Sequence, residues 1–231
     1  MFDFQAGEIL LINKPYKWTS FDVVGKIRQV LKQQLGIKKI KVGHAGTLDP
    51  LATGLLIVCT GKYTKRIEEF QGMDKTYSGT FYLGATTPSY DMETAVDKTF
   101  EISHLTEKEI IGACKKFTGL QQQVPPLFSA VKIGGRRAYD FARNQQECKI
   151  EPREINIINI NITAIRLPEV DFMIVCSKGT YIRALARDLG NALGCGAYLN
   201  ALRRDAIGTY KIEDAITPEQ FEFLIAQQAN K

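Results

Sequence analysis

Histidine and cysteine, the usual protein ligands of zinc, are scarce in this chain. Only His44 and His104 are histidines among 231 residues, and the five cysteines are scattered without a CxxC pair. Zinc sites take several such ligands at short spacings, so we expect no metal site. An odd number of scattered cysteines favours reduced thiols in a cytoplasmic protein over a disulfide framework.

Other sequence signatures are missing as well. No P-loop, no GxGxxG motif after a strand and no HExxH motif occurs, so we expect no nucleotide cofactor and no metalloprotease chemistry. No apolar run approaches the ~20 residues that cross a bilayer. The N-terminus, MFDFQAGEIL, carries acids where a signal peptide would carry a basic region. We therefore expect a cytoplasmic protein without a membrane span.

The charge of the chain is nearly balanced. It holds 30 Lys and Arg against 25 Asp and Glu, a net charge of +5. Such an excess permits a nucleic-acid partner without requiring one. Because 45% of the residues are hydrophobic, the chain can bury a core, and its length fits one large domain or two small ones.

Strand and helix patterns follow one another without strict alternation. Apolar or alternating runs predict strands at 8–12, 55–61, 75–84, 153–167, 170–176 and 207–212. Helical spacing predicts helices at 19–36, 106–119 and 218–228, a short helix near 138–143, and one that starts in SKGTYIR and ends near 194. The alternation slips at Ile157-Ile158, which predicts a bulge. An α+β fold with a mixed or mostly antiparallel sheet fits this order.

The glycine-rich segment GHAGTLDPLATG, residues 43–54, carries one carboxylate and one histidine at the mouth of an apolar strand. Asp49 precedes a proline, and Asp-Pro commonly forms turns, so a purely structural role is open. A functional carboxylate there would need a nearby arginine to stay ionised. For His44, a general-base role and a packing role are both open.

The segment SKGTYIRALARDLG offers such an arginine. Tyr181 and Arg183 stand at the expected helix start, and Arg183 and Arg187 are four residues apart on one helix face. Two solvated arginines on a surface helix are the alternative interpretation. Tyr77, in DKTYSG, is by itself typical of a sheet tyrosine.

A basic stretch with interleaved aromatic residues lies between these segments. It contains Lys132, Arg136, Arg137 and Arg143 together with Phe128 and Tyr139. Positive charge suits phosphates and flat rings suit unstacked bases, so the stretch is a candidate RNA contact. A solvated loop and helix is the alternative.

Six segments together resemble the TruB family of tRNA pseudouridine synthases. In chain order they are NKPYKWTSFDVV, GHAGTLDPLATGLL, DKTYSG, PPLFSAVKIGGRRAYDFAR, SKGTYIRALARDLG and CGAYLNALRRDAIG, and they span nearly the whole chain. The resemblance implies a pseudouridine-synthase fold over residues 1–231, with an inserted RNA-gripping thumb at about 122–149. It also implies isomerisation of the uridine conventionally numbered 55 in the TΨC loop of tRNA, with no cofactor and no metal.

The resemblance assigns a role to individual residues. Asp49 is the catalytic nucleophile, Arg183 pairs with its carboxylate, and Tyr77 packs on the target base and is a candidate for proton transfer. Tyr181 and Leu202 line the base pocket, and His44 fills the space that the flipped base leaves in the RNA loop. Contacts to RNA are implied for Lys14, Lys132, Arg136 and Arg143.

Two departures from the family are visible. Asn13 stands where the family often has aspartate, so no catalytic role attaches to it. Many members continue into a small RNA-binding PUA domain. Only about twenty residues follow the last motif and its strand here, too few for such a domain. We therefore expect that domain to be absent.

The chemistry requires the target base to leave the stack, which costs a few kcal/mol, and a carboxylate beside the sugar. Formation of a covalent adduct and removal of a sugar proton are both open. We expect tRNA as the partner of a monomer with no obligate protein partner. Two other functions remain open: an RNA-folding chaperone that grips the tRNA elbow, and the catalytic subunit of guide-RNA-directed pseudouridylation, which would need partner proteins.

Overall fold

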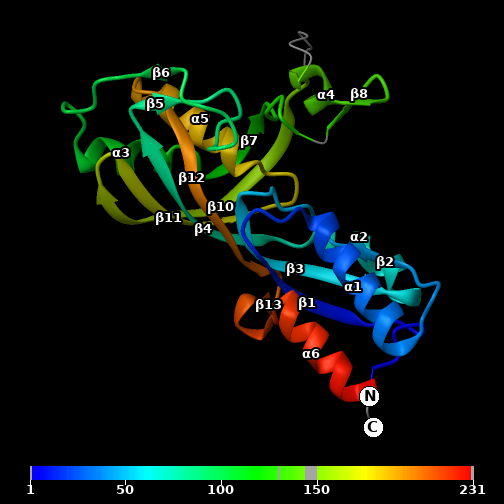
Figure 1. Cartoon of the computed structure of the whole chain (residues 1–231). Coiled ribbons are helices and arrows are strands. Elements are labelled where there is room, and N and C mark those ends of the chain that lie inside the picture. The colour runs from blue at the N-terminus through cyan, green and yellow to red at the C-terminus, as the bar shows by residue number, and fades with distance from the viewer. Residues whose placement is uncertain (1, 130, 144–149, 230–231) are drawn as a thin grey trace. The chain divides into compact units, whose positions relative to one another are not determined.

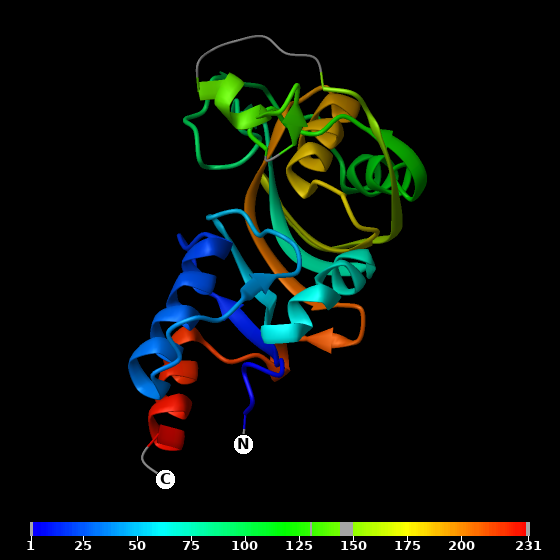
Figure 2. The same cartoon turned by 90° about the vertical axis from the view of Figure 1, so that its right-hand side faces the viewer.

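The computed structural model describes residues 2–129, 131–143 and 150–229, which form two compact units (Figures 1 and 2). The first unit combines residues 1–77 with residues 202–231, and the second comprises residues 78–201. Strands β4 (Lys75–Leu83) and β12 (Ala197–Ile207) contribute residues to both. The first unit is thus built from the two ends of the chain and the second from its middle.

Besides parts of β4 and β12, the described part of the first unit contains three α-helices, four strands and two short 3-10 helices. They are β1 (Ile9–Lys14), α1 (Ser20–Leu35), β2 (Val42–His44), β3 (Ala52–Thr60), η1 (Gly61–Arg66), α2 (Ile67–Gly72), β13 (Tyr210–Lys211), η2 (Ile212–Asp214) and α6 (Pro218–Ala229). The strands pair in the order β1–β3–β12, with β2 on β3 and β13 on β12. The β3–β12 pair is parallel, and the pairs of β3 with β1 and β2 are antiparallel.

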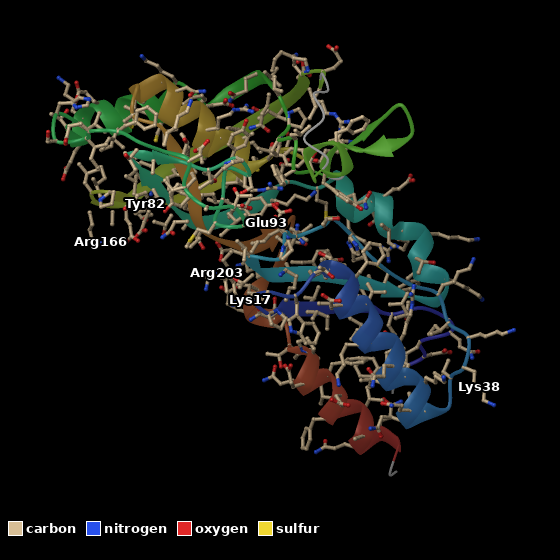
Figure 3. The ribbon with its side chains drawn as sticks, turned by 45° about the horizontal axis from the view of Figure 1, so that its top comes forward. Lys17, Lys38, Tyr82, Glu93, Arg166 and Arg203 are labelled. Atoms are coloured by element: carbon tan, nitrogen blue, oxygen red, sulfur yellow. The ribbon has the colours of Figure 1, made fainter. Side chains whose placement is uncertain are left out.

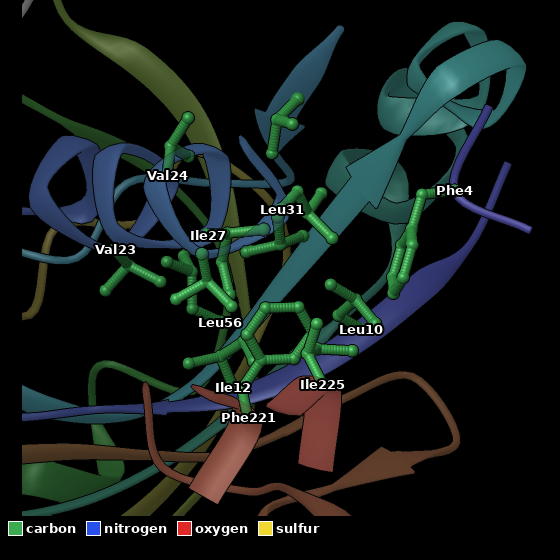
Figure 4. Close-up of a cluster of buried hydrophobic side chains, with 13 residues drawn as sticks. Phe4, Leu10, Ile12, Val23, Val24, Ile27, Leu31, Leu56, Phe221 and Ile225 are labelled. Atoms are coloured by element: carbon green, nitrogen blue, oxygen red, sulfur yellow. The ribbon is translucent and has the colours of Figure 1, made fainter. Parts of the chain in front are cut away.

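Strand β3 is buried on both faces, which explains its nearly continuous apolar sequence. Leu56 and Val58 face a core that α1 and α6 cover with Ile27 and Phe221, among others (Figure 4). The alternate residues Leu55, Ile57 and Cys59 face a second cluster that includes Phe70 and Ile207. The strand that follows the Asp49 segment is therefore anchored from both sides.

Helix α1 begins and ends where the sequence predicts. Thr19 and Asp22 form a capping box at its start, and Gly36 takes the left-handed conformation at its end, with φ of 65°. One apolar residue of this helix, Phe21, is 66% exposed. Phe21 lies in the first turn, and its ring meets the edge of the His44 ring at 5.4 Å between centroids.

The second unit holds a sheet in the order β12–β4–β11–β10–β7. Its elements are β5 (Ala85–Thr86), β6 (Lys98–Thr99), α3 (Glu107–Lys115), β7 (Gly119–Gln123), β8 (Lys132–Ile133), β9 (Arg136–Arg137), α4 (Ala138–Arg143), β10 (Arg153–Arg166), β11 (Glu169–Cys176) and α5 (Ile182–Leu193). The predicted bulge in β10 is confirmed, since the register with β11 shifts between Ile157 and Asn159.

Two element boundaries differ from the prediction. Helix α3 has the predicted Thr106–Glu109 capping box but ends at Lys115, and Gly119 starts strand β7, which pairs with β10. Three of the five residues of β7 are glutamines without an apolar pattern, so β7 forms a strand because it pairs with the long strand β10. The single strand expected at 207–212 is a hairpin, in which Ile207 pairs with Tyr210 across a turn at Gly208.

The observed architecture confirms the predicted α+β class with a mixed, mostly antiparallel sheet flanked by helices. Among the helices that the structure describes, none has the length and apolar character of a membrane span.

Candidate active site

The segment that carries Asp49 joins β2 to β3 in the first unit. Asp49 is half-buried, and its main-chain carbonyl accepts a hydrogen bond of 3.1 Å from the N–H of Ala52. The preceding residue is tied to the start of α1, because Ser20 Oγ accepts from the N–H of Leu48 at 2.9 Å and donates to its carbonyl at 3.2 Å. The helix start therefore fixes the approach to Asp49.

Two buried cations, Lys14 and Arg204, hold the same segment by its main-chain carbonyls. Lys14 Nζ donates to the carbonyls of Trp18 at 2.6 Å, Pro15 at 3.1 Å and Pro50 at 3.3 Å. The guanidinium of Arg204 donates to the carbonyls of Leu55 at 2.8 Å and Gly46 at 3.0 Å.

The accessible surface of Lys14 is 0% and that of Arg204 is 1%. Of the carbonyls that they bind, that of Gly46 precedes Asp49 in the segment and that of Pro50 follows it. Lys14 and Arg204 therefore hold the segment on both sides of Asp49.

The charges of these groups influence one another. Burial lowers the pKa of Lys14, the negative charge of Asp49 opposes the shift and the positive charge of Arg204 adds to it, so that the resulting pKa is about 8 instead of 10.5. Asp49 therefore stands in a positive field that its own unit provides. Lys14 was predicted to contact RNA, but its described contacts are internal, and Arg204 was not recognised from the sequence.

A close approach of two strands explains one glycine of the motif. Gly54 pairs with Arg204 in the parallel β3–β12 register, with φ of +104°. A Cβ at Gly54 would lie 2.4 Å from the carbonyl oxygen of Arg204, far inside contact distance. Only glycine brings the Asp49 segment and Arg204 together in this way.

His44 has a neutral ring in this setting. Its Nδ1 is buried and has no hydrogen-bond partner among the described residues. Burial, followed by the charge of Arg204, lowers the pKa of His44. An uncharged ring packed edge-on against Phe21 is compatible with insertion into a stacked RNA loop, the role that the resemblance implies.

Two predicted pocket residues lie on strands of the first unit. Leu202 is half-buried and pairs with Ala52, three residues after Asp49. Tyr77 lies on β4 and is 9% exposed. Side chains alternate along a strand, so Leu202 and Arg204 share one face of β12, while Arg203 points to the other. Alternation separates Arg204 from Arg203 in the sequence, but by itself it does not tell which of the two is buried.

Arg183 lies in the second unit and is buried, with a side-chain exposure of 4%. Its Nε is 3.5 Å from Oδ2 of Asp91, and its Nη atoms donate to the carbonyls of Ser89 at 3.1 Å and Phe128 at 2.9 Å. The alternative of a solvated arginine is therefore wrong. The pairing of Arg183 with Asp49, which would join the two units, stays a prediction.

Sequence reasoning missed Asp91. Its side chain is 6% exposed, and its Oδ1 accepts a hydrogen bond of 2.9 Å from the N–H of Glu93. It stands in the polar segment TTPSYDMETA, where no spacing distinguishes a buried carboxylate from a turn residue. Only the packing of α5 against this segment reveals its contact with Arg183.

The start of α5 is tied to β7. The N–H of Tyr181 donates to Oε1 of Gln123 at 2.9 Å, and Nε2 of Gln123 donates back to the carbonyl of Tyr181 at 3.2 Å. Arg187, on the same face as Arg183, lies over the ring of Tyr90 at 5.1 Å and contacts Asp188 at 2.8 Å. Both predicted helix-face arginines thus have defined partners.

The predicted thumb contains β8, β9 and α4. Its base is closed by hydrogen bonds from the N–H of Ala138 to the carbonyl of Val131 at 2.7 Å and from Tyr139 to Ser129 at 3.0 Å. The side chains of Lys132, Arg136 and Arg143, and residues 144–149, lie outside the described part of the structure. Their contacts to RNA stay predictions.

Acidic and thiol groups do not gather into a metal site in the described ranges. No group of three or more His, Cys, Asp or Glu side chains that could hold a metal ion occurs there. The described cysteines Cys59, Cys114, Cys176 and Cys195 are buried.

Comparison with known families matches nearly the whole chain. Residues 28–182 match the TruB family pseudouridylate synthase N-terminal domain, and residues 183–231 match the tRNA pseudouridylate synthase B C-terminal domain. The tRNA pseudouridine synthase B of Flavobacterium johnsoniae is 52% identical over 221 residues, covering 95% of this chain and 96% of that protein. The protein of the same name from Bacteroides fragilis is 52% identical over 226 residues, 98% and 97% of the two chains.

Solved structures resemble this chain over almost its full length. A crystal structure of a Cbf5-Nop10-Gar1 complex contains a chain with a TM-score of 0.72 and 28% identity. An H/ACA RNP bound to a substrate RNA containing 2'-deoxyuridine gives a TM-score of 0.70 and 26% identity. This chain spans 60% and 56% of the lengths of those two chains.

Proposed function

We propose that this chain, which belongs to the TruB family of pseudouridylate synthases, converts a uridine of tRNA into pseudouridine. The observation that carries the proposal is the Asp49 segment, whose carbonyls are held by Lys14 and Arg204 in a chain about half identical to tRNA pseudouridine synthases B. The target is the uridine at position 55 of the TΨC loop, as the sequence resemblance implies. The enzyme acts in the cytoplasm as a monomer, without a cofactor or an obligate protein partner.

The first step is the removal of the uridine from the base stack. Tyr77 and Leu202 offset part of the cost of a few kcal/mol by stacking and apolar contact with the flipped base. The uncharged His44 ring takes its place in the loop, because a neutral ring needs less desolvation than an imidazolium. Tyr181 lines the base pocket from the start of α5.

The second step breaks the bond between C1' and N1 of uracil and forms a bond from C1' to C5. The C5 proton is lost and N1 gains a proton, so the reaction is an isomerisation. Asp49 acts as a carboxylate, either by attack on the sugar or by removal of a sugar proton. Arg183, which we propose pairs with it, and Lys14 present positive charge to this carboxylate.

Release of tritium from RNA labelled at C5 of uridine tests the proposal, because that hydrogen leaves only when C5 forms the new bond. With a TΨC stem-loop, the wild-type chain is expected to release tritium and Asp49→Asn is expected to lose at least a thousandfold in kcat. Asp74→Asn is the matched control, since Asp74 is an exposed aspartate of the same unit. Release by Asp49→Asn at the wild-type rate would exclude the proposed role.

The guide-RNA alternative makes a different prediction. The Cbf5 chains are more distant in sequence and longer than this chain, whereas the tRNA pseudouridine synthases B match it end to end. We therefore propose that the isolated chain modifies bare tRNA. Tritium release only after addition of other proteins or a guide RNA would favour the alternative.

A further inference from the structure

The positive excess of the chain is concentrated in two short segments of the first unit. Residues 28–41 and 61–66 contain eight Lys and Arg and no Asp or Glu. The remainder of the chain then holds 22 basic residues against 25 acidic ones. A mildly basic protein is therefore strongly basic in one place and slightly acidic elsewhere.

The two segments lie side by side. The N–H of Gly61 donates to the carbonyl of Lys41 at 2.9 Å, and the adjoining residues Val42 and Thr60 are paired in the β2–β3 ladder. Together they form what we call the basic face, which consists of the exposed residues Arg28, Lys32, Lys38, Lys39, Lys41, Lys62 and Lys65. Figure 3 shows Lys38 projecting from the region just after α1.

The basic face contains two adjoining hollows. One of about 410 Å³ is lined by Arg28, Lys32 and Lys38, among others. The other, of about 370 Å³, is lined by Lys39, Lys41, Lys62 and Lys65 with neighbouring residues. Ile40 borders both hollows, so the charged groups surround a continuous shallow surface rather than a pocket for one small molecule.

The charges of the basic face are not neutralised by the protein. In the part of the chain that the structure describes, none of its lysines has a carboxylate oxygen within 4.0 Å of its ammonium group. Arg28 donates to the carbonyl of Val42 at 2.6 Å, a neutral partner. By contrast, the neighbouring cations Lys26 and Arg66 are paired with Glu222 and Glu69, and we leave them out of the face.

The position of the basic face relates it to Asp49 within one unit. Helix α1 starts beside the Asp49 segment, through Ser20 and Leu48. The basic face begins at Arg28, about 12 Å along the helix, and continues past the helix end at about 24 Å. A polyanion with one nucleotide at Asp49 would meet the basic face well away from that nucleotide.

We propose that the basic face binds the phosphate backbone of the tRNA substrate, at a part of the RNA outside the hairpin that carries the target uridine. This inference rests on the proposed function. Lysine and arginine side chains neutralise phosphates, and such contacts carry no sequence preference. The face therefore contributes affinity for the whole tRNA rather than the choice of uridine.

The test removes four of these charges with Lys38→Gln, Lys39→Gln, Lys62→Gln and Lys65→Gln in one protein. Its KM for full-length tRNA is expected to rise by roughly an order of magnitude, and the slope of log K against log salt to fall by up to ~3. The kcat on tRNA, and both constants on the isolated TΨC hairpin, are expected to stay unchanged. The urea midpoint checks that the variant folds.

A matched control carries four exposed lysines of the second unit changed in the same way, Lys98→Gln, Lys108→Gln, Lys115→Gln and Lys116→Gln. An unchanged KM and salt slope on tRNA would overturn the proposal. So would an equal loss on the hairpin, an equal loss in the control, or a loss of binding to phosphatidylserine vesicles without a loss on tRNA.

Binding measured in the Asp49→Asn background separates this inference from the proposed function. If no tritium is released by the wild-type chain but the salt slope for tRNA still falls on removal of the four lysines, the enzymatic proposal fails and the binding face stands. If tritium is released and the salt slope does not change, the enzymatic proposal stands and the binding face fails.

Discussion

Replacement of Arg204 by methionine tests whether this buried cation positions the catalytic segment. Methionine retains most of the apolar volume but removes the donors to the carbonyls of Gly46 and Leu55. A buried acceptor left without its partner costs about 1–3 kcal/mol, so the loss in unfolding free energy is expected to be about 2–6 kcal/mol. Relief of the repulsion with Lys14 offsets a part of this loss.

The catalytic effect should exceed what unfolding alone explains. A displacement of Asp49 by about 1 Å is expected to lower kcat about a hundredfold. Urea unfolding measures the free energy, and tritium release at a temperature where circular dichroism shows a folded variant measures kcat. Arg204→Lys retains the charge but lacks the planar guanidinium that reaches both carbonyls. Its stability and kcat should therefore lie between those of the wild type and Arg204→Met.

Arg203→Met is the matched control. The neighbouring Arg203 has a side-chain exposure of 57% and contacts Asp205 at 2.6 Å on the surface. Exposed pairs contribute about 0–1 kcal/mol, so this variant should keep its stability and kcat. If Arg204→Met is as stable and as active as Arg203→Met, the carbonyl contacts do not position the segment and the reasoning is wrong.

Three further predictions follow from the contacts described above. Asp91→Asn removes a carboxylate from the buried Arg183, and we expect a loss of about 3 kcal/mol in urea unfolding together with lower kcat; a change below ~0.5 kcal/mol would show that the contact is unimportant. Gly54→Ala should prevent folding of the first unit, as judged by circular dichroism, because its Cβ would lie 2.4 Å from a main-chain oxygen, whereas Gly25→Ala, in the open on α1, should stabilise by about 0.5–1 kcal/mol. The pKa of Lys14 is about 8 in the folded chain and 10.5 in the unfolded chain. Between pH 8 and 10.5 the unfolded chain therefore holds a proton on Lys14 that the folded chain has lost, so the contribution of Lys14 to the unfolding free energy rises with pH. The wild-type chain should therefore gain stability relative to Lys14→Met between pH 8 and 10.5 in urea titrations, and a flat or falling difference would contradict the assignment.

Local signals in the sequence identified most of the secondary structure. The Thr19–Asp22 and Thr106–Glu109 caps and the bulge near Ile157 depend on residues a few positions apart, so a pattern records them. The strand Gly119–Gln123 leaves no such local pattern, because it pairs with β10, whose partner residues lie 30 to 38 positions away in the sequence.

The same distinction holds for the candidate site. The Asp49 segment and the KGTYIR arginine were found because family motifs are contiguous in sequence. The contacts of Arg204 with Gly46 and of Arg183 with Asp91 join residues 158 and 92 positions apart. A buried cation on β12 looks the same in sequence as the exposed Arg203 beside it until the parallel strand pairing is known.

The construction of the first unit from both chain ends has a consequence for synthesis on the ribosome. The core under α1 includes Phe221 and Ile225 of α6, and the Asp49 segment needs Arg204 of β12. At about 5–20 residues per second, these residues emerge roughly ten seconds after the first 77. The nascent chain therefore carries Asp49 before Arg204 and α6 are available to hold its segment, so we expect activity to appear only after α6 has been made.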